Sequence, residues 1–226
     1  MKVFRSINDA VRGKVQNTPQ NKAHNLTEIT KMTLPTVFVV YYSAYGHLRV
    51  PGQYSQKRLP KAKNSQTNYS QEEFENGDAF MFSFPSRFGT PPAQVQTFID
   101  STGGLWFKKA LVGKMVGVFT GTGDQSGGQE STVFTFLPNL IHQGMLYVPI
   151  GFTHDNLFIV DEVVGGSAYG SGLISSLSGQ RTVSEKEIAV VIHHDQSFTK
   201  TESRYLAKFN RIHTQTFYSS LIPHFL

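Results

Sequence analysis

"VFVVYYSAYGHLRVPGQYSQ", residues 37–56, contains the pattern that decides the fold. An apolar run ends at Tyr42, and a small polar turn that includes Gly46 follows at once. A run that is apolar on both faces is typical of a strand inside a parallel sheet. A turn with exposed backbone N–H groups suits a phosphate or another anion. The stretch therefore predicts a buried strand that leads directly into an anion-binding loop.

Similar apolar runs recur along the chain and alternate with amphipathic stretches. The predicted strands span residues 36–42, 78–84, 114–120 and 145–152. The predicted helices span residues 92–103, 129–144 and 184–198; Pro138 should kink the second, and a capping-box pattern opens the third. The glycine- and serine-rich stretch 164–182 is expected to be a loop. This alternation predicts an α/β fold, in which a parallel sheet carries helices on both faces.

Composition limits the classes of protein to which the chain can belong. Of its 226 residues 39% are hydrophobic and 16% are charged, so it can bury a core. The absence of cysteine excludes disulfides, thiolate metal sites and thiol chemistry. The net charge of +5 resides mostly near the two ends, rather than on a basic face of the kind that binds nucleic acid. No apolar run is long enough to span a membrane.

Composition and charge also indicate how the chain is organised into segments. We expect residues 1–32 to be a basic, disordered extension, residues 33–207 to be the folded domain and residues 208–226 to be a tail. The extension lacks the apolar centre of a secretory signal. We expect a cytoplasmic protein, either free or peripheral to the plasma membrane. Mitochondrial import is the alternative, because the extension is basic and poor in acidic residues.

Polar, glycine-bearing loops follow the first three predicted strands. They are "SAYGHL" (43–48), "PSRFGTPPAQ" (85–94) and "TGTGDQSGGQE" (120–130). Because ligands of parallel sheets bind outside the carboxyl ends of the strands, the loops should meet at one site. There is no Walker-type phosphate loop and no nucleophile elbow. We predict no metal site either, because adjacent residues such as His193 and His194 point about 100° apart on a helix.

Six motifs together resemble those of a known family. "YYSAYGH", "PSRFGTPPAQ", "FIDSTGGLW", "TGTGDQSGGQE", "LIHQGMLYVPIGF" and "VVGGSAYG" occur in the order and near-spacing of the WrbA-like flavodoxin family, over residues 34–200. Members are FMN-dependent NAD(P)H:quinone oxidoreductases. The resemblance implies a flavodoxin-like, doubly wound parallel sheet of strand order 2-1-3-4-5. It also implies FMN as cofactor, NAD(P)H as co-substrate and two-electron reduction of a small quinone. The assembly implied is a homo-oligomer, dimer or tetramer, whose pockets are shared between subunits.

The resemblance also implies which residues form the site. The flavin itself would carry the chemistry through its N5 atom, so no catalytic side chain is assigned. The implied phosphate loop consists of Ser43, Ala44, Tyr45, Gly46, His47 and Leu48. The residues implied around the flavin ring are Ser86, Arg87, Phe88, Gly121, Thr122, Gly123, Asp124, Gly127 and His142. Trp106 would stand beside the quinone pocket, and Tyr45 would also meet the nicotinamide nucleotide.

The chain departs from the family after its first loop. Only 30 residues separate His47 from Asp78, where the family has a long helix and then an edge strand. Pro51 and Gly52 also disfavour a helix there. We therefore predict that the first helix and edge strand 2 are reduced or absent, with residues 56–63 as a remnant of the strand. The loss would expose one face of the first strand unless the terminal segments or a partner cover it. An alternative function is then a catalytically impaired paralogue that acts as a regulatory or assembly partner.

Overall fold

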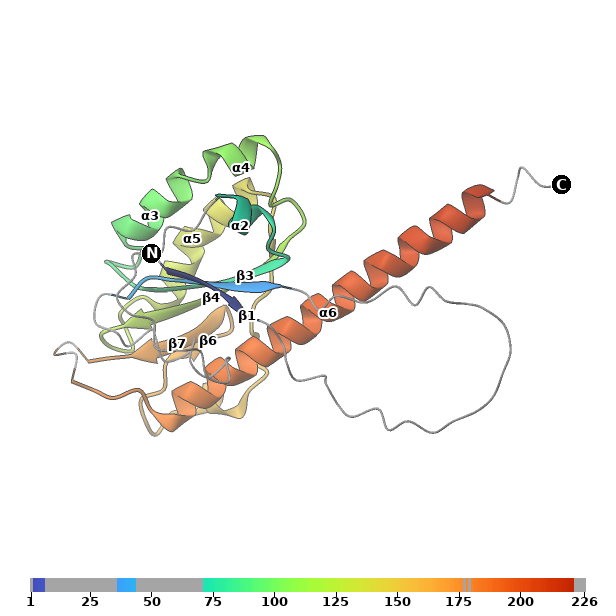
Figure 1. Cartoon of the computed structure of the whole chain (residues 1–226). Coiled ribbons are helices and arrows are strands. Elements are labelled where there is room, and N and C mark those ends of the chain that lie inside the picture. The colour runs from blue at the N-terminus through green and yellow to red at the C-terminus, as the bar shows by residue number, and fades with distance from the viewer. Residues whose placement is uncertain (1, 7–35, 44–70, 177, 179, 222–226) are drawn as a thin grey trace, which may run out of the picture.

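The computed structural model describes residues 2–6, 36–43, 71–176, 178 and 180–221 (Figure 1). For residues 2–6, 71, 73 and those beyond Lys208 it describes the backbone alone. The strands are β1 (Lys2–Ser6), β2 (Val37–Tyr41), β3 (Ala79–Pro85), β4 (Met115–Thr122), β5 (Leu146–Tyr147), β6 (Gly166–Ser167) and β7 (Gly170–Ile174). The helices are α2 (Gln71–Glu75), α3 (Ala93–Asp100), α4 (Gly103–Phe107), α5 (Gln129–His142), the 3₁₀ turn η2 (Asp155–Phe158) and α6 (Glu185–Leu221).

A mostly parallel sheet organises the described part of the chain. Its strand order is β1-β2-β3-β4-β7-β6, and the short β5 pairs with the start of β4. The pairs β2–β3, β3–β4 and β4–β7 are parallel. Strands β2, β3 and β4 take the places 1, 3 and 4 of the predicted flavodoxin order, and β5 and β7 together take place 5. The flavodoxin-like α/β fold is therefore confirmed.

The fifth strand is split, which the sequence analysis did not predict. Of the predicted strand over 145–152, only Leu146 and Tyr147 pair with β4, and β7 completes the position from within the predicted loop. Strand β7 could not be recognised from the sequence, because its glycines lack the β-branched side chains that are typical of strands. A Cβ at Gly170 would lie 2.2 Å from the Val118 carbonyl oxygen, so the close approach of β7 to β4 requires glycine. The prediction of a loop over residues 164–182 is wrong for β6 and β7.

The edge next to β2 is occupied by β1. This strand runs antiparallel to β2, with Lys2 opposite Tyr41 and Ser6 opposite Val37. An exposed strand edge offers unpaired N–H and C=O groups that any extended segment can satisfy. The expectation of disorder is therefore wrong for residues 2–6. The predicted loss of the first helix and the remnant strand at residues 56–63 lie outside the described residues.

One face of the sheet carries an aromatic core. Phe80, Phe82 and Phe84 alternate along β3 and point to this face, as expected for the two-residue period of a strand. Phe98 of α3 and Phe136 of α5 pack on them, with ring centroids 4.8–6.1 Å apart and edge-to-face geometry. Such pairs add about 0.5–1.5 kcal/mol each beyond the area that they bury. This layer holds α3 and α5 against the sheet.

Helix α6 packs on the opposite face. Val191 and Phe198 of α6 share a buried cluster with Val37 and Val39 of β2, and these valines are only 2% and 5% exposed. Within the described chain α6 covers these two side chains, so this part of the first strand is not exposed. In Figure 1 the helix runs along this face and projects beyond the sheet.

Helix α6 is longer than expected and begins with an ion pair. It continues past the predicted helix end and through the predicted tail to Leu221, because no glycine or proline interrupts it until Pro223. At its start Glu187 accepts hydrogen bonds from the backbone N–H groups of Ser184, Gly165 and Ile174 at 2.8–3.2 Å. The Arg181 guanidinium lies 2.8 Å from the same carboxylate. The predicted capping box is therefore present, and it also fastens β6 and β7 to α6. None of the described helices is both long and apolar enough to cross a membrane.

Candidate functional site

Three loops leave the carboxyl ends of neighbouring strands at the same edge of the sheet. Tyr42 donates its backbone N–H to Ser83 at 2.8 Å, and Ser86 donates its own to Gly121 at 2.7 Å. These bonds continue the sheet to the point where each loop begins. In the first loop only Ser43 is described, and the other five predicted phosphate-loop residues lie outside the described residues. Their assignment stays a prediction.

The loop after β3 is a tight hairpin that presents an aromatic tip. Arg87 and Thr90 exchange backbone hydrogen bonds of 2.8 and 3.0 Å around Phe88 and Gly89. Both central residues have positive φ, 54° and 75°, as a type I′ turn requires. Phe88 is fully exposed, at 104% of its reference area. A bulky residue with positive φ costs about 1–3 kcal/mol, and such strain concentrates at functional sites.

The loop after β4 presents a row of backbone donors. The Thr122 hydroxyl donates to the Asp124 carbonyl at 2.6 Å, and the Gly127 N–H donates to the same oxygen at 3.2 Å. Within the described chain the N–H groups of Asp124, Gln125 and Ser126 make no hydrogen bond. Adjacent free donors at the end of a parallel strand suit a polar ring edge or an anion.

The β3 hairpin and the start of α5 pack directly against each other. A Cβ at Gly128 would lie 3.0 Å from the Gly89 Cα, and both residues have positive φ, 89° and 75°, which favours glycine at each position. Thr132 of α5 donates to the Ser86 hydroxyl at 2.8 Å, and Thr135 donates to the Gly89 carbonyl at 3.2 Å. The predicted ring residues of the two loops are therefore brought together by α5.

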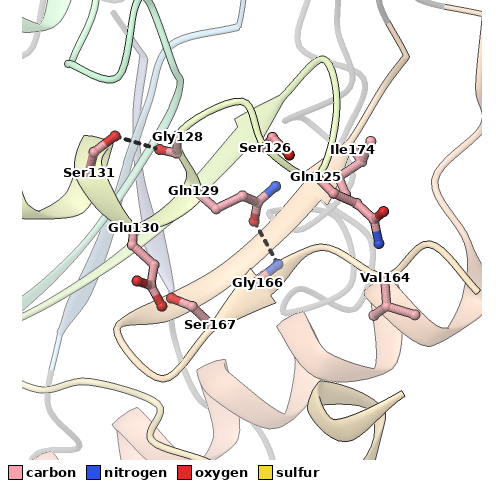
Figure 2. A pocket seen from close by; sticks show the side chains of 10 residues that line it. All are labelled: Gln125, Ser126, Gly128, Gln129, Glu130, Ser131, Val164, Gly166, Ser167 and Ile174. Atoms are coloured by element: carbon pink, nitrogen blue, oxygen red, sulfur yellow. Dashed lines mark hydrogen bonds between the residues drawn. The ribbon is translucent and has the colours of Figure 1, made fainter. Parts of the chain in front are cut away.

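Gln129, the first residue of α5, belongs to this arrangement, although the sequence analysis assigned it no role. It is 9% exposed, and its side chain bonds to Thr122 at the end of β4, to β7 and to β6. A cavity of about 480 Å³ lies beside it (Figure 2). The cavity is lined by Gln125, Ser126, Gly128, Gln129, Glu130, Ser131, Val164, Gly166, Ser167 and Ile174. The signal that was available is a polar residue directly after a glycine pair, at a helix start, but nothing local shows that it is buried.

Two predicted site residues lie elsewhere in the chain's own fold. His142 ends α5, whose 14 residues separate it by about 20 Å from the loop at Gln129. Trp106 is in α4, and Gln143 donates to Thr102 at the start of α4 at 2.7 Å. Both residues are exposed, and the described chain does not bring them to the two ring loops.

The fold and the edge of converging loops define a flavodoxin-like protein with a ligand site at the carboxyl ends of its strands. The solved WrbA-like flavodoxin from Agrobacterium tumefaciens has the same fold, with a TM-score of 0.55 and 18% identity over 74% of this chain and 96% of that one.

The family follows from sequence comparison. The profile of the NADPH-dependent FMN reductase family matches residues 27–156. The P25 protein of Schizosaccharomyces pombe is 36% identical over 199 residues, covering 76% of this chain and 98% of that protein. Quinone-oxidoreductase QR2 of Triphysaria versicolor is 36% identical over 184 residues, covering 70% and 90%. The chain therefore belongs to the NADPH-dependent FMN reductase family, and the resemblance to the WrbA-like quinone oxidoreductases is confirmed.

Proposed function

We propose that the protein is an FMN-dependent NAD(P)H:quinone oxidoreductase that uses the edge formed by the loops after β2, β3 and β4. The observation that carries the proposal is the pairing of the β3 hairpin with the β4 loop. One loop offers the exposed ring of Phe88, and the other offers the free N–H groups of residues 124–126. Curated relatives named as quinone oxidoreductases and NAD(P)H dehydrogenases (quinone) support the same activity.

The residues that are described fit a flavin. The polar edge of its ring needs amide donors, which the backbone of residues 124–126 supplies, and its flat face needs an apolar wall such as Phe88. The phosphate would bind the loop that starts at Ser43, where backbone donors can hold it without a lysine. When bound, FMN supplies hydride transfer, and the protein supplies binding and orientation. Because the cofactor supplies the chemistry, no nucleophile or general base is needed at this edge of the sheet.

A second copy of the chain is proposed to complete the quinone pocket. Trp106, Phe107 and Ile141 are 55%, 83% and 67% exposed, and His142 follows Ile141 on the same helix end. An exposed group of large apolar side chains is typical of an interaction surface. In a dimer or tetramer this surface of one subunit would supply Trp106 and His142 to the flavin site of the next.

FMN titration of the purified protein, followed by quenching of flavin fluorescence, tests the proposal. We expect stoichiometric binding and NAD(P)H-dependent reduction of benzoquinone. Phe88→Ala should weaken FMN binding, whereas Phe158→Ala, which removes an aromatic ring that is 61% exposed on η2, should not. A protein that stays colourless after soaking with FMN, yet still forms oligomers, would instead be the impaired paralogue.

A further inference from the structure

The Gln129 amide is held in one orientation by three contacts. Its Nε2 donates to the Thr122 hydroxyl at 2.8 Å and to the Leu173 carbonyl at 3.2 Å. Its Oε1 accepts the Gly166 N–H at 2.6 Å, a bond visible in Figure 2. A backbone N–H can only donate and a carbonyl can only accept, so a flipped amide would lose both contacts to the backbone. The side chain therefore presents its donor to Thr122.

That donor directs the Thr122 proton. A hydroxyl has one proton to donate, and its lone pairs accept. Because the Thr122 oxygen accepts from Gln129, its proton is free to go to the Asp124 carbonyl, 2.6 Å away. The same carbonyl accepts the Gly127 N–H. Both bonds close the turn whose middle N–H groups, at residues 124–126, make no hydrogen bond within the described chain.

The neighbouring strands leave room for the amide. A Cβ at Gly172 of β7 would lie only 2.0 Å from the Gln129 Oε1 atom, and a Cβ at Gly166 would lie 3.1 Å from the Gly172 nitrogen. Only glycine therefore allows β6 and β7 to approach Gln129 this closely. The amide joins the β4 loop to two strands that the chain reaches about 40 residues later.

We propose that Gln129 is a positioning residue for the flavin, which acts through the Thr122 hydroxyl to hold the β4 loop in its binding shape. The inference rests on the proposed function, because it takes residues 122–127 as a flavin-binding loop. FMN affinity should then depend on the hydrogen that Gln129 donates, and not only on the volume that its side chain fills.

The other end of α5 offers a matched control. There Gln143 donates from Nε2 to the Thr102 hydroxyl at 2.7 Å, and Thr102 donates to the Ile99 carbonyl at 2.6 Å. Thr102 and Thr122 are both buried, at 1% and 5% exposure. The amide, hydroxyl and carbonyl repeat the chemistry at Gln129, but about 20 Å from the flavin loops of the same subunit. Neither Gln143 nor Thr102 is among the residues proposed to reach the flavin of the next subunit.

The decisive experiment replaces each amide by a carboxyl group of the same shape and measures FMN affinity at two pH values. In Gln129→Glu the ionised carboxylate accepts from Thr122 and competes for its proton, so we expect FMN to bind about tenfold more weakly at pH 8. The protonated carboxyl can donate again, so affinity should return to within about threefold of wild type at pH 5.5. Gln143→Glu should match wild type within about twofold at both pH values.

Other ionisable groups near Gln129 do not alter the interpretation of the pH dependence of FMN affinity. Asp124 lies on the loop, Glu130 follows on α5, and Glu187 lies behind β6 and β7. All three are present in the wild type, as is the titratable FMN phosphate. The quantity compared is therefore the ratio of variant to wild-type affinity at each pH.

A second set of variants tests whether the effect passes through Thr122. Thr122→Ser keeps the hydroxyl and should retain FMN affinity, whereas Thr122→Val should lose about tenfold. In the Thr122→Val background, Gln129→Glu should add less than about twofold, because residues in one hydrogen-bond chain are not additive. Fully additive losses would overturn the proposal, as would a loss in Gln129→Glu that is equal at both pH values.

The test remains decisive if Gln129→Glu folds poorly or if FMN does not bind at all. In the first case the comparison of Thr122→Ser with Thr122→Val replaces the Gln129→Glu measurement. In the second case the proposed function fails with the wild type, and exchange of the Gly127 amide hydrogen in the flavin-free protein becomes the measure. Gln129→Glu should then accelerate that exchange about tenfold at pH 8 relative to Gln143→Glu, after correction for global stability. Equal exchange would overturn the positioning role.

Discussion

The two faces of the sheet are stabilised in different ways. On the α3 and α5 face the buried side chains are apolar, many of them aromatic, or carry neutral polar groups such as those of Thr102, Gln129 and Thr132. On the α6 face apolar residues share the interface with Glu187, His194 and Glu202, which are at most 2% exposed. The first face depends on packing, which is insensitive to pH. The second face should therefore be where pH and charge alter the stability of the fold.

The buried polar groups of the α6 face differ in how well they are paired. Glu187 meets Arg181 and several backbone N–H groups. His194 bonds to the Ser171 hydroxyl at 2.9 Å through Nδ1. Neither carboxyl oxygen of Glu202 has a hydrogen-bond partner among the described residues. These three groups provide a graded set of tests.

Phe82→Ala should have the largest effect, because it opens a cavity in the aromatic face. Phe82 is 1% exposed and contacts both Phe98 and Phe136. We expect a loss of about 3–5 kcal/mol in the free energy of unfolding, with little dependence on pH. Urea denaturation measures it. Phe107→Ala removes the same ring from a position that is 83% exposed, and a comparable loss there would contradict the reasoning.

Arg181→Met should be the most disruptive change on the α6 face. It leaves the Glu187 carboxylate buried without its cation, while the backbone donors remain. Because the Arg181 side chain is 25% exposed, we expect a loss of about 2–4 kcal/mol, towards the lower end of values for broken buried pairs. Adding Glu187→Gln should restore part of this loss. A double variant that is less stable than Arg181→Met would argue that the carboxylate itself, rather than the pair, is required.

His194 should make the fold acid-sensitive. Burial lowers the pKa of His194 from 6.5 to about 4, so the unfolded chain takes up its proton first as the pH falls. Stability linked to this group is complete above pH 6.5 and decreases by about 2–3 kcal/mol as the pH falls to 4. His194→Asn, compared with wild type by urea denaturation from pH 8 to 4, should remove that part of the slope. Parallel curves would show that the histidine contributes nothing.

Glu202 should have the opposite and smallest pH effect. Burial, and then the nearby Asp78, raise the pKa of Glu202 from 4.5 to about 7, so the folded chain holds this proton longer than the unfolded chain. The resulting cost grows as the pH rises from 4.5 to 7 and is complete above 7. Glu202→Gln should therefore stabilise the protein by about 1–3 kcal/mol at pH 8 and by almost nothing at pH 4. Thermal melts at the two pH values measure this difference.

Local patterns were sufficient for much of the fold. The apolar runs of β2, β3 and β4 and the helical spacing in α3 and α5 appear within a few residues of the predicted bounds. These elements are continuous in sequence and bury one or both faces, so their periodicity is strong. The strand over residues 170–174 was not predicted, because a strand that contains glycines lacks this periodicity of apolar side chains. The end of α6 was predicted too early, because a helix with polar residues can continue until a glycine or proline ends it.

Some features of the candidate site could also be predicted from local sequence, and others could not. Glycine-bearing turns after apolar strands can be recognised locally, so the loops themselves were located from the sequence, whereas the flavin roles of Ser86, Phe88 and Thr122 came from the resemblance to the WrbA-like family. Gln129 was not assigned, because its three partners lie 7 to 44 residues away, at the end of β4, in β6 and in β7. The distance of His142 from the loops after β3 and β4 could not be predicted either, because a motif does not show which end of a helix lies near a site.

The sequence by itself determined the class of this protein, since strands, helices and loop motifs depend on short-range spacing and residue type. Only the tertiary structure decided which segments pair at the two sheet edges, how the polar groups under α6 are matched, and which buried amide supports the β4 loop. Each of these depends on contacts between residues far apart in the chain. Such contacts form only when the whole sheet brings the partners together, and no local pattern records them.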